Sequence, residues 1–263
     1  MVAVEKQLHD LVHSTALKGF TEAALAYSQG RPEYPPAVLQ WIREKLLLGP
    51  GKRAVDLGAG TGKFTRMLVQ SGAQVTAIEP VDAMRAELRR LLPDVETISG
   101  TAQAMPLESG SVDSVVCAQA FHWFATRDAL EEIHRVLTPG GTFGLIWNVR
   151  DESVGWVREI SGIVKPHQGT TPSLHTGLWR QVFSGEFFSD LEETVVPYEH
   201  VGPPQSVIID RCMSVSYIGA LPATEKAQVR AQLQSLIDTA PELRGLAIIA
   251  FPYKTRLYSC VRH

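Results

Sequence analysis

Three glycines at alternate positions, directly after an acidic residue, are the residues whose types and spacing first indicate chemistry. A short apolar run leads to Asp56; Gly58, Gly60 and Gly62 follow, and apolar residues at helical spacing begin at Phe64. This order predicts a strand, a tight turn and a helix, as at the start of a nucleotide-binding α/β unit. Glycine is needed in such a turn because a side chain would keep the backbone away from a ligand.

The spacing of this turn separates three ligand classes. A dinucleotide-binding turn has its third glycine three residues after the second, whereas Gly62 follows Gly60 by two. A phosphate-binding P-loop continues after its lysine with Ser or Thr, whereas Phe64 follows Lys63 here. The negative charge of Asp56 would also repel phosphates, and it favours a cationic ligand such as an ammonium group beside a sulfonium.

A second carboxylate, Glu79, follows the next apolar run, residues 75–78. It stands at the distance in sequence where a carboxylate takes both hydroxyls of a ribose. An adenosine that carries a positive charge and no phosphate is S-adenosylmethionine. The residues therefore predict S-adenosylmethionine as the cofactor, bound by Asp56, the glycine turn 58–62 and Glu79.

Five segments in order resemble the motifs of class I S-adenosylmethionine-dependent methyltransferases. They are VDLGAGTG (55–62), AIEP (77–80), GTAQAMPL (100–107), VDSVVCAQAFHWF (112–124) and EIHRVLTPGGTF (132–143). The pattern is closest to the small-molecule branch typified by trans-aconitate methyltransferase, which carries a segment similar to residues 27–36. The resemblance implies an α/β fold with a Rossmann-like, doubly wound, seven-stranded sheet. That sheet would be mostly parallel, with an antiparallel C-terminal strand and a helical insertion after strand five.

The same resemblance implies a set of cofactor-binding residues. They are Tyr27, Arg31, Asp56, Gly58, Ala59, Gly60, Thr61, Gly62, Glu79, Pro80, Met84, Thr101, Ala102, Gln103, Ala118 and Gln119. Many relatives carry an acid where Thr101 or Gln103 stands. The adenine edge is therefore expected to contact the backbone at Ala102 and the Gln103 side chain. Two roles are open for Met84: it could line the edge of the adenine pocket, or it could pack in the core through its own helix.

The acceptor side is expected after the fourth strand, where the transferred methyl group should emerge. His122 is a candidate general base there, and a structural histidine on an aromatic turn is the alternative. Candidate acceptor-binding residues are Tyr34, Trp123, Trp147, Arg150 and Arg211. The two arginines would bind an acidic acceptor or form surface ion pairs. A flap of residues 27–34, hinged near Gly30, would cover the pocket.

Periodicity predicts alternating strands and helices over most of the chain. Strands are expected at 53–57, 74–79, 95–99, 112–118, 142–147, 191–201 and 257–261, and helices at 61–71, 81–92, 126–137, 205–218 and 223–238. Ligands of such sheets bind outside the carboxyl ends of the strands. Because Asp56, Glu79, Ala118 and Trp147 all stand at those ends, we expect them to share one cleft.

The 263 residues are expected to form one methyltransferase domain, 1–263. Its parts would be N-terminal helices and flap at 1–50, the cofactor-binding half at 51–148, and the acceptor-side insertion with the last strands at 149–263. A net charge of −3 without a polybasic run predicts neither a nucleic-acid nor a membrane partner. No metal is implied, since no cluster has ligand spacing. Three scattered cysteines and the lack of a signal-peptide pattern favour a cytoplasmic protein, monomeric or homodimeric.

The sequence thus predicts transfer of a methyl group from S-adenosylmethionine to an oxygen, nitrogen or carbon of a small molecule. A carboxylate acceptor would need no base. Methylation of a protein side chain is one alternative, and a catalytically silent protein that keeps the cofactor fold for interaction is another. A closed aromatic pocket built from residues 150–220 would favour the small molecule, and a polar open cleft would favour the protein substrate.

Overall fold

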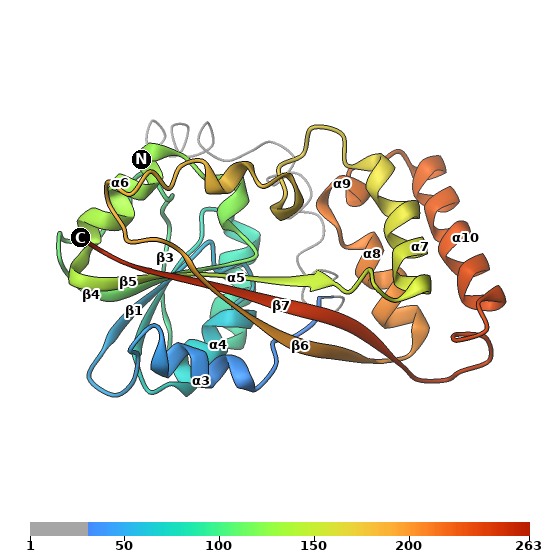
Figure 1. Cartoon of the computed structure of the whole chain (residues 1–263), viewed down its shortest axis with the longest axis horizontal. Helices are drawn as coiled ribbons and strands as arrows, with labels where there is room; N and C mark the ends of the chain where they lie inside the picture. The colour runs from blue at the N-terminus through green and yellow to red at the C-terminus, as the bar shows by residue number, and fades with distance from the viewer. Residues whose placement is uncertain (1–30) are drawn as a thin grey trace.

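The centre of the molecule is a twisted seven-stranded sheet, seen in a computed structural model that describes residues 31–263 (Figure 1). The strand order is β3-β2-β1-β4-β5-β7-β6. The strands are β1 (Arg53–Leu57), β2 (Gln74–Ile78), β3 (Glu96–Ile98), β4 (Val112–Ala118), β5 (Leu137–Arg150), β6 (Glu192–Gly202) and β7 (Ile249–Val261). Pairs among β1–β5 are parallel, and β7 is antiparallel to both β5 and β6. The predicted seven-stranded, mostly parallel sheet with an antiparallel last strand is confirmed.

Helices connect the strands and cover both faces of the sheet. The α-helices are α3 (Ala37–Glu44), α4 (Lys63–Gln70), α5 (Asp82–Leu91), α6 (Arg127–Val136), α7 (Gly155–Val164), α8 (Arg211–Met213), α9 (Ser216–Gly219) and α10 (Ala223–Thr239). Single 3₁₀ turns lie at η1 (Phe121–Trp123), η2 (Lys165–His167), η3 (Leu174–Thr176) and η4 (Leu178–Arg180), and a π-helical segment lies at η5 (Gln205–Asp210). Among these, α6 begins at Thr126, whose hydroxyl accepts a hydrogen bond from the Ala129 N–H.

Alternate residues of each central strand point to opposite faces, and both faces are buried. On one face, Ala54 of β1 packs with α3 and α4 through a cluster that includes Ile42 and Leu68. On the other face, Val55 packs with α6 in a cluster that also holds Trp179 from η4. Burial of both faces explains why the strand sequences are almost continuously apolar rather than alternating.

A separate group of helices lies at one end of the sheet, at the right of Figure 1. Helices α7, α8, α9 and α10 pack around the outer part of β7, where Ile249, Phe251 and Tyr253 join their hydrophobic cluster. The expected insertion after strand five therefore comes in two pieces. Helix α7 precedes β6 in the chain, and α8, α9 and α10 follow it.

Three boundaries differ from those expected from the sequence. Strands β5 and β7 continue well beyond 142–147 and 257–261, because they pair with each other as far as Arg150 and Tyr253. Pro252 lies inside β7, and proline inside a run weakens a strand prediction. The helix expected at 205–218 is divided into η5, α8 and α9, with a break at Ser214.

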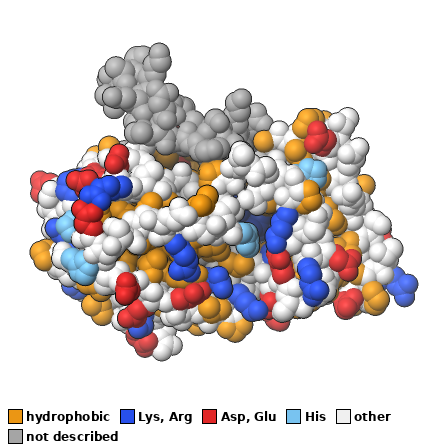
Figure 2. Space-filling view, turned by 45° about the horizontal axis from the view of Figure 1, so that its top comes forward, with side chains coloured by type: hydrophobic (Ala, Val, Ile, Leu, Met, Phe, Trp, Pro, Cys, Tyr) orange, Lys and Arg blue, Asp and Glu red, His pale blue; other side chains and the backbone are white. Residues whose placement is uncertain are grey.

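The surface carries charges of both signs. On the face shown in Figure 2, acidic and basic side chains are interspersed and no large patch of one sign dominates. Across residues 31–263 no helix combines the length and apolar character that a membrane crossing requires. Within that same range no cluster of three or more His, Cys, Asp or Glu side chains is placed to hold a metal ion.

The contact between α3 and β5 gives a prediction for stability. A Cβ added at Gly144 would lie 2.9 Å from Leu46 Cδ1 and 3.1 Å from Trp41 Cη2. Gly144→Ala should therefore overpack this layer and lower the free energy of unfolding by about 1–3 kcal/mol. The matched control is Gly162→Ala in α7, where the added methyl meets nothing within 4 Å. That control should be neutral or stabilising by up to about 1 kcal/mol in urea unfolding. Equal effects of the two substitutions would contradict the packing argument.

Candidate active site

The glycine turn between β1 and α4 forms the floor of the site. Gly58, Gly60 and Gly62 all have positive φ angles, of 72°, 57° and 85°. A Cβ at Gly58 would also lie 2.8 Å from the Ala120 Cβ, so the turn needs glycine there for space as well as for conformation. The turn lies at the end of β2, because the Gly58 N–H donates to the Ile78 carbonyl at 2.8 Å.

Asp56, the last but one residue of β1, lies beneath this turn with a fully buried carboxyl group. Its Oδ2 accepts a hydrogen bond from Thr65 Oγ1 at 2.6 Å. Its Oδ1 is buried and has no hydrogen-bond partner among the described residues. Burial raises the pKa of Asp56 to about 7, although the Thr65 hydroxyl favours the charged form. An unpaired carboxylate oxygen in such a place is an acceptor that a cationic ligand would satisfy.

Glu79 is the second buried carboxylate, directly after β2, and its two oxygens hold the backbone on either side of the site. Oε2 accepts from the Gly60 N–H and Oε1 from the Val81 N–H, each at 2.9 Å. Burial raises the pKa of Glu79, and these backbone bonds and the Arg85 guanidinium oppose the shift. Each oxygen retains a second lone pair. Glu79 is thus held rigidly and can still accept further hydrogen bonds.

The residues expected around an adenine follow β3 and lie in α5, next to Glu79 and the end of β2. Thr101, Ala102 and Gln103 follow β3, and Met84 lies in α5 with only 2% of its surface exposed. The Ala102 side chain belongs to the core beneath the sheet, which leaves its backbone for contact with a ligand. The buried Thr101 hydroxyl has no hydrogen-bond partner among residues 31–263. Pro80 is half-buried between Glu79 and the start of α5.

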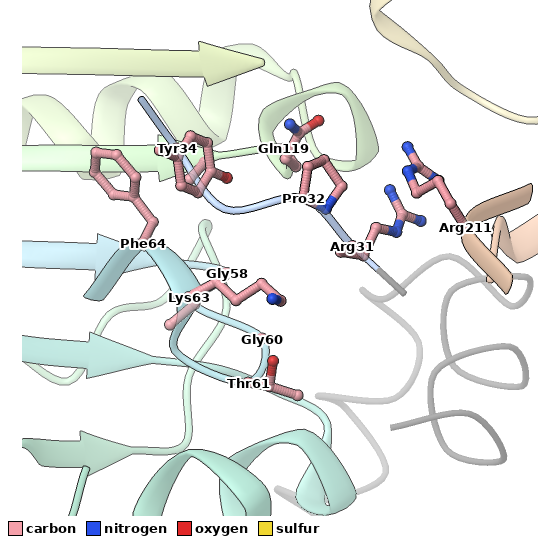
Figure 3. A pocket seen from close by; sticks show the side chains of 12 residues that line it. Arg31, Pro32, Tyr34, Gly58, Gly60, Thr61, Lys63, Phe64, Gln119 and Arg211 are labelled. Atoms are coloured by element: carbon pink, nitrogen blue, oxygen red, sulfur yellow. The ribbon is translucent and has the colours of Figure 1, made fainter. Parts of the chain in front are cut away.

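One pocket brings together candidates from both the cofactor side and the acceptor side of the site (Figure 3). Its lining residues are Arg31, Pro32, Tyr34, Gly58, Ala59, Gly60, Thr61, Lys63, Phe64, Ala118, Gln119 and Arg211. Nine of these twelve were expected from the sequence, and Pro32, Lys63 and Phe64 were not. Lys63 had the pattern of an exposed helix charge, and no signal in the sequence distinguished it from one.

The backbone at Gln119 has an unusual conformation at the mouth of this pocket. Its φ of 60° lies in the left-handed region, which is uncommon for a residue other than glycine. The conformation is held by the hydrogen bond from its N–H to the Ile146 carbonyl at 2.8 Å. Such conformations cluster at functional sites.

The described part of the predicted flap crosses over the pocket. The Glu33 carboxylate accepts from Lys63 Nζ at 2.7 Å, and the Glu33 carbonyl accepts from Asn148 Nδ2 at 2.9 Å. Tyr34 packs edge-on against Phe64 with 5.0 Å between ring centroids. Residues 31–34 are thus fixed to α4 and to β5. Tyr27 and Gly30 lie outside the described residues.

The two candidate arginines, one at the end of β5 and one at the start of α8, have different surroundings. Arg150, at the end of β5, places Nη2 3.3 Å from the Cys212 Sγ. Arg211 is 7% exposed, and its Nε and Nη1 are buried without a hydrogen-bond partner among the described residues. Only Arg211 of the two lines the pocket, beside Arg31 in Figure 3. The structure thus places Arg211 in the lining of this pocket and Arg150 outside it.

The aromatic candidates after β4 and in β5 do not line this pocket either. Trp147 was expected to line the acceptor pocket, but it is 2% exposed and packs against Trp179 with 4.8 Å between ring centroids. It lies in the core because β5 continues to Arg150, so residue 147 is not at the end of its strand. Its indole N–H reaches His122, which is half-buried in η1 next to Trp123.

Comparisons with known proteins add the following findings. A family model described as a methyltransferase domain matches residues 55–145. A methyltransferase-like protein of Schizosaccharomyces pombe, described as uncharacterised, is 35% identical over 254 residues, which cover 92% of this chain and 95% of that protein. The YcgJ protein of Bacillus subtilis superposes with a TM-score of 0.57 at 20% identity, over 86% of this chain and 98% of that one.

A further solved structure shares the fold and holds ligands. Phosphoethanolamine N-methyltransferase 2 of Haemonchus contortus, solved with phosphomonomethylethanolamine and S-adenosylhomocysteine, superposes with a TM-score of 0.56 at 16% identity. The superposition covers 92% of this chain and 57% of that one. At this identity the likeness concerns the fold alone.

The buried Asp56 carboxyl predicts a pH dependence of stability. Its pKa rises from an ordinary 3.8 to about 7 on folding, so between these values the folded chain holds a proton that the unfolded chain has lost. Stability should therefore fall as the pH rises from about 4 to 7, by an Asp56 contribution on the order of 2–4 kcal/mol. Asp56→Asn should remove this contribution, so the free energy of unfolding in urea should differ less between pH 5 and pH 8 in the variant than in the parent.

The control for this experiment is Asp113→Asn. Backbone and lysine hydrogen bonds lower the pKa of Asp113 on folding, so its contribution to stability is lost as the pH falls rather than as it rises. A stability difference between the parent and Asp56→Asn that stays constant from pH 5 to pH 8 would show that Asp56 titrates normally.

Proposed function

This chain belongs to the class I S-adenosylmethionine-dependent methyltransferases, and we propose that it transfers a methyl group from S-adenosylmethionine to a small-molecule carboxylate. The observation that carries the cofactor assignment is the buried Oδ1 of Asp56 under the glycine turn, which has no hydrogen-bond partner in residues 31–263. A cationic ligand would give that oxygen a partner. The same ligand would offset the cost of burying a carboxylate.

The residues around the turn suit the separate parts of this cofactor. Asp56 would hold the ammonium end, with the open backbone of Gly58 and Gly60 allowing close approach. The free lone pairs of Glu79 would accept from the ribose hydroxyls. Gln103 and the Ala102 backbone would contact the adenine edge, close to the Thr101 hydroxyl, which no described residue pairs.

When bound, S-adenosylmethionine supplies a methyl group on a positively charged sulfur, which is displaced in line by the acceptor. The chain's own task is to hold the acceptor collinear with that bond and to exclude water. Residues 31–34 suit the second part of this task, because Glu33 and Tyr34 fix them across the pocket. We propose that this segment forms the cover over the cofactor.

The cationic wall of the pocket supports an anionic acceptor. Arg211 has two buried N–H groups without partners among residues 31–263 and lies opposite the glycine turn. Arg31 lies beside it, whereas Lys63, which lines the same pocket, already pairs with the Glu33 carboxylate. A buried guanidinium without a partner is costly unless a ligand pairs with it, and its planar fork matches a carboxylate. The π-helical segment η5 directly precedes Arg211, and such segments are frequent at functional sites.

The enclosure of this guanidinium favours a small molecule over a protein side chain as acceptor. At 7% exposure the Arg211 side chain is reached from inside the pocket. A free carboxylate can enter and be surrounded there, and small-molecule sites are concave and largely enclosed in this way. A carboxylate acceptor is also ionised at neutral pH, so no general base is needed.

Cofactor binding is tested at Glu79. Glu79→Ala should weaken S-adenosylmethionine binding by about 2–4 kcal/mol in calorimetry, because two charge-assisted hydrogen bonds to the ribose are lost. The control is Glu108→Ala, which removes an exposed carboxylate after the adenine segment and should leave the affinity unchanged. Undiminished affinity in a Glu79→Ala variant with a normal thermal transition would refute the ribose assignment.

Acceptor binding is tested at Arg211, where function and stability should change in opposite directions. Arg211→Met removes a buried, unpaired charge and should raise the free energy of unfolding by on the order of 1 kcal/mol. The same change should lower kcat/KM for a carboxylate acceptor about 10–100-fold without altering S-adenosylmethionine affinity. Arg43→Met, on the exposed side of α3, is the control. A destabilised Arg211→Met variant with parental turnover would show that the arginine is structural.

The acceptor group itself is identified by the product. The full chain is incubated with S-adenosylmethionine labelled in the methyl group and with benzoate, succinate, citrate or octanoate. A methyl ester releases labelled methanol on mild alkaline hydrolysis, whereas an N-methyl or C-methyl product does not. Transfer that yields only alkali-stable label would overturn the carboxylate assignment and leave the methyltransferase assignment intact.

A further inference from the structure

A hydrogen bond between Trp147 and His122 determines which imidazole nitrogen carries the proton. Trp147 Nε1 lies 3.2 Å from His122 Nδ1. An indole N–H can only donate, so Nδ1 must accept and is unprotonated. A neutral imidazole has one proton, which is therefore on Nε2. Trp147 is rigid in this role, because its ring is buried against Trp179 and Tyr258.

The groups around His122 disfavour its charged form. Burial, the Arg31 guanidinium from the segment before α3 and His175 from η3 lower the pKa of His122 to about 3. Each of these factors acts in the same direction, and no acidic side chain is among the groups that shift this pKa. The imidazole therefore stays neutral throughout the physiological range, with the proton arrangement that Trp147 dictates.

The position of His122 connects this proton to the acceptor side of the site. His122 lies in η1, three residues after the pocket residue Gln119. The pocket residue Arg31 is close enough to shift its pKa. Within residues 31–263, His122 Nε2 makes no hydrogen bond. The chain thus keeps a neutral N–H donor available next to its cationic pocket wall.

We infer that His122 binds an oxygen of the methyl acceptor as an N–H donor through Nε2, and that Trp147 is the positioning residue that fixes this proton. This inference rests on the proposed methyl transfer and specifies the acceptor further. His122 has no free lone pair with which to remove a proton, so it is not the general base expected from the sequence. The acceptor must arrive already deprotonated, as a carboxylate does.

The reaction then proceeds without any proton transfer. A carboxylate oxygen lone pair forms the new bond to the methyl carbon while the bond from carbon to sulfur breaks, and its electron pair stays on sulfur. One negative and one positive charge disappear together, and the products are a methyl ester and a thioether. His122 donates to the carboxylate oxygen that is not attacked, and Arg211 supplies the opposite charge.

The proton position is measured on the full chain with ¹⁵N-labelled histidine, loaded with S-adenosylhomocysteine. The His122 signals, assigned by their loss in His122→Gln, should show a protonated Nε2 and a bare Nδ1 from pH 8 down to about pH 5. Trp147→Phe should release the fixed tautomer and give a mixture of both. Trp41→Phe, another buried tryptophan on the opposite face of the sheet, should leave the His122 signals unchanged. A protonated Nδ1 or an imidazolium at pH 6 would overturn the inference.

The donor role is measured by comparing two substitutions in methyl transfer to the four carboxylate probes. Gln can place an N–H close to the position of Nε2, so His122→Gln should keep kcat/KM within about 3-fold of the parent. His122→Phe fills the space without a donor and should lose about 10–100-fold. A plot of kcat/KM against pH for the parent should show no inflection near the ordinary histidine pKa of about 6.5.

Equal losses of kcat/KM in both variants would restore the general-base interpretation. An inflection in the pH dependence of the parent that His122→Gln abolishes would do the same. If no carboxylate probe is methylated, the acceptor class and the donor role fail together. The nitrogen spectra still decide the proton position in that case, so the two failures are distinguishable. Thermal transitions of both His122 variants establish that they are folded.

Discussion

The parallel register of β1 with β2 and β4 is the constraint on which the rest of the site depends. Asp56 lies opposite Ala77 and Val116, so the three strands end at one level and their next residues meet there. The glycine turn, Glu79 and Gln119 are brought together by this alignment. A slip of one residue would reverse the faces of β1 and turn the Asp56 side chain to the opposite side of the sheet.

Several groups in the site lower the stability of the folded chain, and packing elsewhere in the fold must offset this cost. Asp56 Oδ1 and two nitrogens of Arg211 are buried without partners in the described chain, and Gln119 has a left-handed backbone. The ionised forms of these two groups have opposite charge; Asp56 lies under the glycine turn and Arg211 at the start of α8. They suit a cationic cofactor near the turn and an anionic acceptor near the helices, which is the charge pair that methyl transfer neutralises. Stability given up in this way is typical of active sites.

The helical part of the molecule, α7 to α10, forms the proposed acceptor side, whereas the parallel strands carry the cofactor side. Its hydrophobic cluster is separate from those of the central sheet, and it is joined to them through the long strands β5, β6 and β7. This construction places Arg211 opposite the glycine turn without altering the cofactor side. Under the proposed function, the residues of α7 to α10 would set acceptor specificity, while the parallel strands would keep the cofactor side the same.

The sequence by itself predicted the strands β1 to β5 and the helices between them, because their apolar patterns are local, and the resemblance to class I methyltransferases supplied the seven-stranded sheet. The turn 55–62 and the acid after the run 75–78 keep their meaning in any fold that contains them. The trans-aconitate-like branch remains a prediction. Tertiary structure alone decided the acceptor side, since Arg211, Lys63 and Trp147 have the same local patterns whether they are exposed, buried or in a pocket. Only the packing of η5 and of the extended β5 left two Arg211 nitrogens without a partner among the described residues and gave Trp147 a contact with His122.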